Sequence, residues 1–226
     1  MARSEGRADA PENDSALPLL NAMSLFSYVL DHDYGFAPNP FFGVCTLATC
    51  KPKIRDRASL GDYVMGTGCA KQNRRGRLVY MMRVDEITTY DAYWADERFR
   101  RKRPTEGRGT AHAFGDNIYH RESGVWQQAN SFHSFPDGRP NPLNRDHDTG
   151  SERVLIGREF VYFGGAGPMI PARFRNWNDT DVCAGRAYKR HFPDGMAEAV
   201  VAWATGLGQG RVGEPADWAR LQAHAR

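Results

Sequence analysis

The chain has 226 residues, of which 41% are hydrophobic and 25% charged, and its net charge is +3. This length and composition suit a single globular domain and argue against a disordered chain. No apolar run approaches the roughly 20 residues that a membrane-spanning helix needs, which argues against a membrane protein. Residues 1–20 are rich in Ala, Pro, Ser and charge and lack the apolar core of a signal peptide, so they predict a disordered leader.

The cysteines argue against a disulfide framework or a zinc site. Cys45, Cys50, Cys69 and Cys183 include no Cys-x-x-Cys pair, and without an export signal we expect reduced thiols and a cytoplasmic protein. Because the paired ligand spacings of a zinc site are absent, the sequence predicts no metal and no cofactor. Most of these cysteines are expected to be small buried hydrophobic residues.

The first half of the chain predicts mainly strands. Branched and aromatic residues indicate strands within 24–31, 43–50, 59–68 and 77–88. The polar segment 71–76 is typical of a hairpin connection. Residues 33–43 contain Pro38, Pro40 and two glycines and predict an ordered loop. Aromatic residues at helical spacing after Thr89 predict a short capped helix over 89–101.

The second half predicts a long polar region followed by helices. Residues 115–150 show little periodicity and predict a functional or mobile loop. A strand is expected over 152–164, and helices over 173–178, 194–207 and 214–225. This order favours an α+β fold whose curved, mostly antiparallel sheet forms a small barrel. We expect one domain over 21–193 and a helical extension over 194–226.

Residues 31–55 are the most unusual segment of the sequence. They combine aromatic side chains with prolines and glycines, and cations follow directly. Between Lys51 and Arg108 there are 15 Lys and Arg against 8 Asp and Glu, so this part carries +7 and the rest of the chain −4. A basic segment in a nearly neutral protein is typical of contact with a polyanion.

Recognition of a base outside a duplex needs aromatic planes, hydrogen-bonding groups and nearby cations. The residues that we expect to contact a base are Tyr34, Phe36, Asn39, Phe41, Thr46, Asp116 and Asn117. The cations that we expect to contact phosphates are Lys51, Lys53, Arg55, Arg98, Arg101 and Lys102.

Catalysis is less well supported by the sequence. The common nucleophile, metal and phosphate-binding motifs are absent. The polar region supplies four candidates for acid–base chemistry, namely Asp116, His120, His133 and Asp148. The thiols of Cys45 and Cys50 lie near cations, and His120 or His133 could act as a base toward them, although nothing in the spacing requires it.

Six segments resemble the nucleotide modification associated domain 2 family. They are DYGFAPNPFFGVCTLATCKPKIR (33–55), GDYVMGTG (61–68), GRLVYMMRVDEI (76–87), YWADERFRRKRP (93–104), GDNIYHR (115–121) and ERVLIGREFVYFG (152–164). The resemblance implies a role in making or recognising modified nucleotides. A weaker resemblance to EVE and other PUA-like barrels implies a base pocket beside a barrel, near residues 33–49.

Two hypotheses follow. The first is a PUA-like domain that binds a modified or flipped base in nucleic acid, or a modified nucleotide. No contact with a membrane is expected. The second is an enzyme that modifies a base or nucleotide with residues of 115–149. In a third interpretation the chain is an accessory subunit that joins a partner modification enzyme through its C-terminal helices.

Overall fold

The computed structural model describes residues 23–70 and 73–219. The predicted leader and the end of the predicted helix 214–225 lie outside these residues. A six-stranded sheet has the order β10-β1-β3-β4-β9-β11. Its strands are β1 (Leu25–Leu30), β3 (Tyr63–Gly68), β4 (Leu78–Arg83), β9 (Phe160–Tyr162), β10 (Tyr188–Lys189) and β11 (Gly210–Arg211). The β1–β3 and β9–β11 pairs are parallel, and the other pairs in this sheet are antiparallel.

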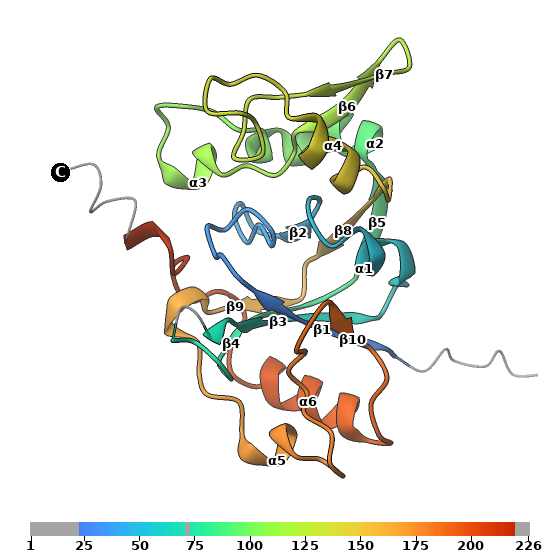
Figure 1. Ribbon diagram of the computed structural model, residues 1–226, viewed down its shortest axis with the longest axis vertical. Coiled ribbons are helices and arrows are strands. Elements are labelled where there is room, and N and C mark those ends of the chain that lie inside the picture. Colours follow the sequence, from blue (N-terminus) through green and yellow to red (C-terminus); the bar gives the residue numbers. More distant parts are fainter. Residues whose placement is uncertain (1–22, 71–72, 220–226) are drawn as a thin grey trace, which may run out of the picture.

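A second, smaller sheet lies over the first. It has the order β2-β8-β5, with β2 (Cys45–Leu47), β8 (Arg153–Gly157) and β5 (Glu86–Thr89) all paired antiparallel. A separate antiparallel hairpin joins β6 (Tyr119–Glu122) to β7 (Val125–Gln128). In Figure 1 the large sheet crosses the lower half of the molecule, the small sheet lies above it, and the hairpin is at the top.

The helices are short, with one exception. They are α1 (Pro52–Arg57), α2 (Tyr90–Ala95), α3 (Thr110–Ala113), α4 (Pro142–Asp148), α5 (Ala172–Arg175) and α6 (Met196–Thr205), with 3-10 helices at Glu97–Lys102 and Gly164–Ala166. The predicted cap of α2 is confirmed, because Thr89 Oγ1 accepts a hydrogen bond from Ala92 N at 3.3 Å. The helix predicted over 194–207 is confirmed as α6.

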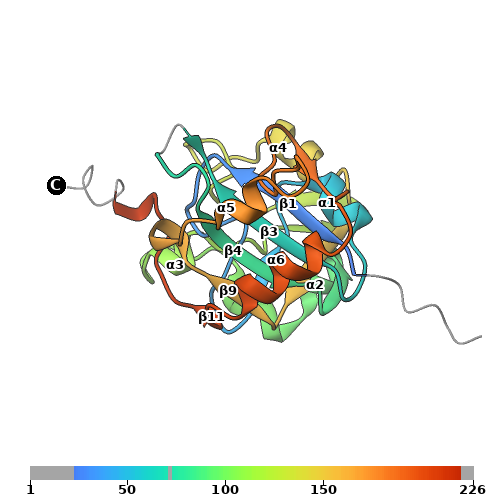
Figure 2. The ribbon, with the colours of Figure 1, turned by 90° about the horizontal axis from the view of Figure 1, so that it is seen from below.

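Strand alternation divides the core between the two faces of the large sheet. Along β1, Phe26 and Tyr28 pack toward the small sheet, whereas Leu25 packs toward α6. The helix α6 buries Met196 and Val200 against that lower face. Figure 2 shows α5 and α6 lying across β3 and β4. The helix predicted from sequence thus covers one face, and the other face carries the elements with the functional candidates.

The segment predicted as one strand over 77–88 is two strands in different sheets. It bends at Val84–Asp85, and the neighbouring strands β8 and β9 bend beside it. The Asp85 carboxylate holds both bends together by accepting hydrogen bonds from Arg158 N at 2.7 Å and Glu159 N at 3.0 Å. Gly157 is required there, since a Cβ atom at this position would lie 2.5 Å from Arg83 O.

The predicted α+β class is confirmed, but the barrel is not. Among the described residues, β10 and β11 end the large sheet and β2 and β5 end the small one, so neither sheet closes. The sharp bends explain the difference, because they fold the sheet into two layers instead of curving it into a ring. In the same residues, no helix is both long enough and apolar enough to cross a membrane.

Candidate functional site

Cys50 occupies a strained turn between a strand and a helix. The chain leaves β2, turns through Ala48–Lys51 and enters α1 at Pro52. Cys50 has φ 56° and Lys51 has φ 43°, so two consecutive residues with side chains adopt the left-handed conformation. Such backbone strain persists only where the surroundings enforce it, and it is concentrated at active sites. We call residues 48–51 the Cys50 turn.

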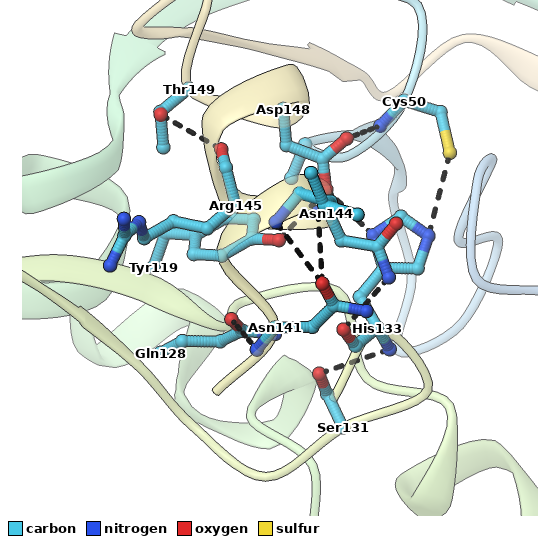
Figure 3. Close-up of polar contacts among 12 residues, drawn as sticks. Cys50, Tyr119, Gln128, Ser131, His133, Asn141, Asn144, Arg145, Asp148 and Thr149 are labelled. Carbon is cyan, nitrogen blue, oxygen red and sulfur yellow. Dashed lines mark hydrogen bonds and ion pairs between the residues drawn. The ribbon is translucent and has the colours of Figure 1, made fainter. Parts of the chain in front are cut away.

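Cys50, His133 and Asp148 form a hydrogen-bonded line. Cys50 Sγ lies 3.8 Å from His133 Nε2, and His133 Nδ1 lies 2.7 Å from Asp148 Oδ2. In Figure 3 the sulfur points toward the imidazole, and the carboxylate reaches the opposite side of the ring. A nucleophile, a base and a group that orients the base are the parts of a catalytic triad, which is recognised by geometry and not by sequence order.

Asp148 is the fixed centre of this arrangement. It ends α4, is fully buried, and accepts three hydrogen bonds through its carboxylate. The donors are His133, the backbone N of Cys50 at 2.7 Å and the Tyr119 hydroxyl at 2.9 Å. The carboxylate therefore positions the His133 imidazole and the backbone of Cys50 together.

His133 is held from the loop that follows β7. Its backbone O accepts a hydrogen bond from Asn144 Nδ2 at 2.9 Å, and its ring lies 4.7 Å from the ring of Phe36. Burial alone would lower the pKa of His133, but its hydrogen bonds to Asp148 and Cys50 outweigh burial and raise that pKa to about 9. The imidazole is therefore protonated at neutral pH, and its Nε2 faces Cys50 Sγ.

Cys50 and His133 line a pocket of about 210 Å³, which we call the triad pocket. Its walls are largely aromatic, with Tyr28, Tyr34, Phe36 and Phe132 beside Cys50 and His133. The Tyr34 and Phe132 rings lie 4.7 Å apart, and Phe132 is 47% exposed at the surface. Pockets for drug-sized ligands measure roughly 300–1,000 Å³, so this pocket is smaller than a typical ligand site.

Cys50, His133 and Asp148 also form a cluster of atoms within 4.8 Å of one another that could hold a metal ion. However, His133 Nδ1 is bonded to Asp148, which leaves Sγ and Nε2 facing each other. Two ligands are fewer than the three or four protein ligands of zinc sites. The arrangement fits a hydrogen-bonded triad better than a metal centre.

Of the residues expected to contact a base, Tyr34 and Phe36 line the pocket. Four others, namely Asn39, Thr46, Asp116 and Asn117, are fully buried elsewhere. Asp116 accepts hydrogen bonds from the hydroxyls of Thr46, at 2.6 Å, and Tyr93, at 2.9 Å. All four side chains are buried away from the pocket and form hydrogen bonds inside the protein, and of their polar atoms Asn117 Oδ1 is buried without a partner.

Two of the expected phosphate-binding cations are buried too. Lys102 Nζ donates to Asn39 O at 2.9 Å, Asn39 Oδ1 at 2.7 Å and Val44 O at 3.1 Å, so all three of its protons are used. Burial lowers the pKa of Lys102 to about 8, although Asp116 opposes this effect. Arg55 donates to backbone carbonyls around the Cys50 turn.

The remaining expected cations are accessible. Lys51 lines the pocket, with Nζ 4.8 Å from the centre of the Tyr28 ring. Lys53 is exposed, Arg98 is bonded to Glu86 and Asp96, and Arg101 lies over the Phe42 ring. Among the expected acid–base residues, His120 stacks on Trp94 at 4.0 Å and is not part of the triad.

A C-terminal strap, residues 214–218, fastens the loop that carries Tyr34. Asp33 N donates to Asp217 Oδ2 at 2.6 Å, and Asp217 N donates to Asp33 O at 3.0 Å. Trp218 Nε1 donates to Tyr34 O at 2.8 Å, and its ring stacks on Phe41 at 5.4 Å. Phe41 thus supports the pocket loop from behind.

Sequence reasoning missed Tyr28, Tyr119 and Phe132 as parts of the site. In the sequence, Tyr28 has the pattern of an ordinary strand residue. Its position beside Cys50 and Lys51 depends on the stacking of the two sheets. Phe132 stands directly before His133, and this adjacency is the one signal that could have indicated it.

Comparison with known proteins gives one positive result. No curated protein and no solved structure matches the chain. The model of the family described as nucleotide modification associated domain 2 matches residues 22–222, nearly the whole chain. The resemblance seen in the six sequence segments is thereby confirmed, and the chain belongs to the nucleotide modification associated domain 2 family.

Proposed function

We propose that this protein is an enzyme that modifies a nucleotide, or a base in nucleic acid, by covalent catalysis through Cys50. The observation that carries the proposal is the line from Cys50 Sγ through His133 to the buried Asp148 carboxylate. Membership in the nucleotide modification associated family supports the choice of substrate.

The proposed chemistry uses one nucleophile and one proton carrier. Cys50 Sγ forms a bond to an electrophilic carbon of the substrate while the thiol proton resides on His133. His133 then gives this proton to the leaving group as the bond to that group breaks. Water or an amine then attacks the carbon of this thioester-type intermediate and the carbon–sulfur bond breaks. The attacking group leaves with the product, and its proton returns through His133 to Cys50 Sγ. Asp148 keeps the imidazole oriented and stabilises its charge.

The aromatic pocket suits a flat reacting group. Tyr34 and Phe36 form two of its walls, and a base extruded from a strand is held by stacking in a pocket of this kind. Lys51, at the pocket mouth, and the exposed Lys53 are proposed to contact a phosphate. The buried cations Arg55 and Lys102 are excluded from this role because their protons are bonded inside the protein.

A second candidate function is recognition of a modified base without chemistry. The ring of Tyr34, which lines the pocket, favours it, because this ring stacks on His32 at 5.9 Å and on Phe114 at 5.2 Å between centroids. The two functions make different predictions for Cys50→Ser. A reader keeps its ligand affinity and its cellular function, whereas a thiol enzyme keeps the affinity and loses the function.

The direct test is the reactivity of Cys50 toward iodoacetamide, followed peptide by peptide with mass spectrometry. Cys183 is the matched control, because it is half-buried like Cys50 and burial raises its pKa to about 11. We expect Cys50 to react about tenfold faster at pH 6.5 than an ordinary thiol, allowing for the lower intrinsic nucleophilicity of a stabilised thiolate.

The pH profile separates a triad from an exposed thiol. In the native protein the rate should stay nearly constant from pH 6.5 to 8, because His133 remains protonated. In His133→Asn it should rise about tenfold per pH unit, as for a free thiol. A rising profile in both proteins would overturn the assignment of Cys50 as an activated nucleophile.

A further inference from the structure

A second hollow lies on the other side of the loop that carries the pocket residues. It has a volume of about 520 Å³ and lies between the turn at Pro40–Gly43 and the strands β9 and β11. Through Arg158, Phe160 and Gln209 it continues into a neighbouring hollow of about 690 Å³. We call the two together the Phe42 groove. It shares no residue with the triad pocket.

The first part of the groove carries positive charge only. Among the described residues that line it, Arg158 and Arg211 are charged and none is acidic. Both arginines form ion pairs at the surface, Arg158 with Glu86 at 2.6 Å and Arg211 with Glu214. Exposed ion pairs contribute little, so a phosphate can replace these carboxylates.

The aromatic ring in the groove is presented under strain. Phe42 has φ 63°, a conformation that is rare for a bulky residue and costly to maintain. The strain is not needed for the core, because the Phe42 side chain is only half-buried and its neighbour Phe41 fills the interior. Arg101 lies 4.5 Å from the Phe42 ring and His112 lies 4.7 Å from it. A partly exposed ring beside an arginine is an arrangement that can stack a base and contact its phosphate.

We infer that the Phe42 groove binds a single strand of nucleic acid that flanks the nucleotide in the triad pocket. The inference rests on the proposed function for its choice of ligand, and it specifies a polymer rather than a free nucleotide. Ala37 of the pocket and Pro40 of the groove are three residues apart, which is at most about 11 Å along an extended chain. That span is short enough for neighbouring nucleotides of one strand to occupy the pocket and the groove.

The test uses the full-length protein and a fluorescein-labelled 12-residue oligothymidylate, followed by fluorescence anisotropy over a range of salt concentrations. Phe42→Gly removes the ring and accommodates the positive φ, so this variant should fold. It should weaken binding roughly 5- to 150-fold, the range measured for loss of one stacked base. The double variant Arg158→Ala/Arg211→Ala should lower the slope of log affinity against log salt by about 1.4, or about 0.7 for each phosphate contact.

Arg173→Ala is the matched control. Arg173 is an exposed arginine over an aromatic ring, 4.7 Å from Phe174, and it lines neither part of the groove. This variant should bind like the native protein. Unchanged affinity and salt slope in both groove variants would overturn the inference. It would also be overturned if thymidine monophosphate displaced the labelled oligonucleotide as well as unlabelled oligothymidylate does at the same concentration of nucleotides.

The result of the oligonucleotide-binding test does not depend on whether Cys50 is reactive. Groove-dependent oligonucleotide binding together with an unreactive Cys50 would retain the groove and reject the proposed enzyme. A reactive Cys50 with no groove-dependent binding would do the reverse.

Discussion

At the scale of single residues, the Asp148 carboxylate accepts hydrogen bonds from three different donors at once. Its two carboxylate oxygens serve a backbone N–H, a phenol and an imidazole. An asparagine has a single acceptor oxygen and two N–H donors, so at least one of the three partners would face another donor. The orientation of His133 and the position of Cys50 depend on the same side chain.

We therefore predict that Asp148→Asn lowers both reactivity and stability. Without the carboxylate, the raised pKa of His133 falls toward its ordinary value, and the rate of Cys50 alkylation at pH 6.5 should drop about tenfold. Unfolding in urea should show a loss of about 1–3 kcal/mol, the cost of an unsatisfied buried polar group.

Asp146→Asn is the control for this prediction. Asp146 lies in the same helix, but its side chain is exposed and is bonded to Arg145. Its replacement should leave both measurements unchanged. Equal effects of the two substitutions would show that the helix, and not the carboxylate of Asp148, determines the reactivity.

At the scale of elements, the Cys50 turn depends on the short helix α1 that follows it. Arg55 of α1 is fully buried, and its guanidinium donates to Cys50 O at 2.9 Å and to Ser151 O at 2.8 Å. It also donates to the carbonyl of Asp148. The Arg55 side chain thus connects the Cys50 turn to the end of α4, in agreement with the positions of these elements in Figure 1.

Arg55→Met is expected to destabilise the fold by about 3–5 kcal/mol, since several buried carbonyls lose their donor at once. Arg57→Ala at the exposed end of the same helix removes one bond to the Tyr188 hydroxyl and should cost no more than about 0.5 kcal/mol. Urea unfolding followed by circular dichroism measures both. A small effect at Arg55 would mean that the turn holds its strained conformation without this connection.

At the scale of the whole molecule, His133 makes stability depend on pH. Its folded pKa of about 9 lies above its ordinary value of 6.5. A base whose pKa is raised by folding stabilises the native state fully below pH 6.5, and this contribution is lost as pH rises through about 9. The shift from 6.5 to about 9 corresponds to no more than about 3–4 kcal/mol.

The urea midpoint should therefore fall between pH 6.5 and 9 in the native protein and change less in His133→Asn. Lys102 acts with the opposite sign, because its pKa of about 8 lies below its ordinary value, so its contribution rises above pH 8. The difference between the two proteins isolates His133. Parallel curves would contradict the hydrogen-bonded pair with Asp148.

The sequence predicted the elements better than their arrangement. The amphipathic pattern of residues 194–207 and the strong β-propensity of residues 77–88 depend on local side chains, and both yielded regular structure. The bend at Val84–Asp85 depends on Asp85 accepting hydrogen bonds from residues more than 70 positions away. No local pattern contains that information, and the barrel prediction failed for this reason.

The sequence offers Cys50, His133 and Asp148 as separate chemical candidates but does not show that they lie together. Their contacts span 83 and 98 positions, and no local pattern encodes such contacts. The amides and carboxylates near residues 39 and 116 look in sequence like base-reading groups. In the structure they satisfy the buried Lys102 and the hydroxyls around it. Polar composition alone does not distinguish a pocket wall from an interior network.

The C-terminal strap is synthesised long after the loop that it fastens. Trp218 Nε1 donates to Tyr34 O across 184 positions of sequence. At about 5–20 residues per second, a ribosome needs roughly 9–37 s to travel between these two residues. During that interval the loop with Tyr34 and Phe36 has no strap to fasten it, although Cys50 has already been made. The nascent chain therefore contains Cys50 early, but the strap can fasten the loop beside it only after translation has passed Trp218.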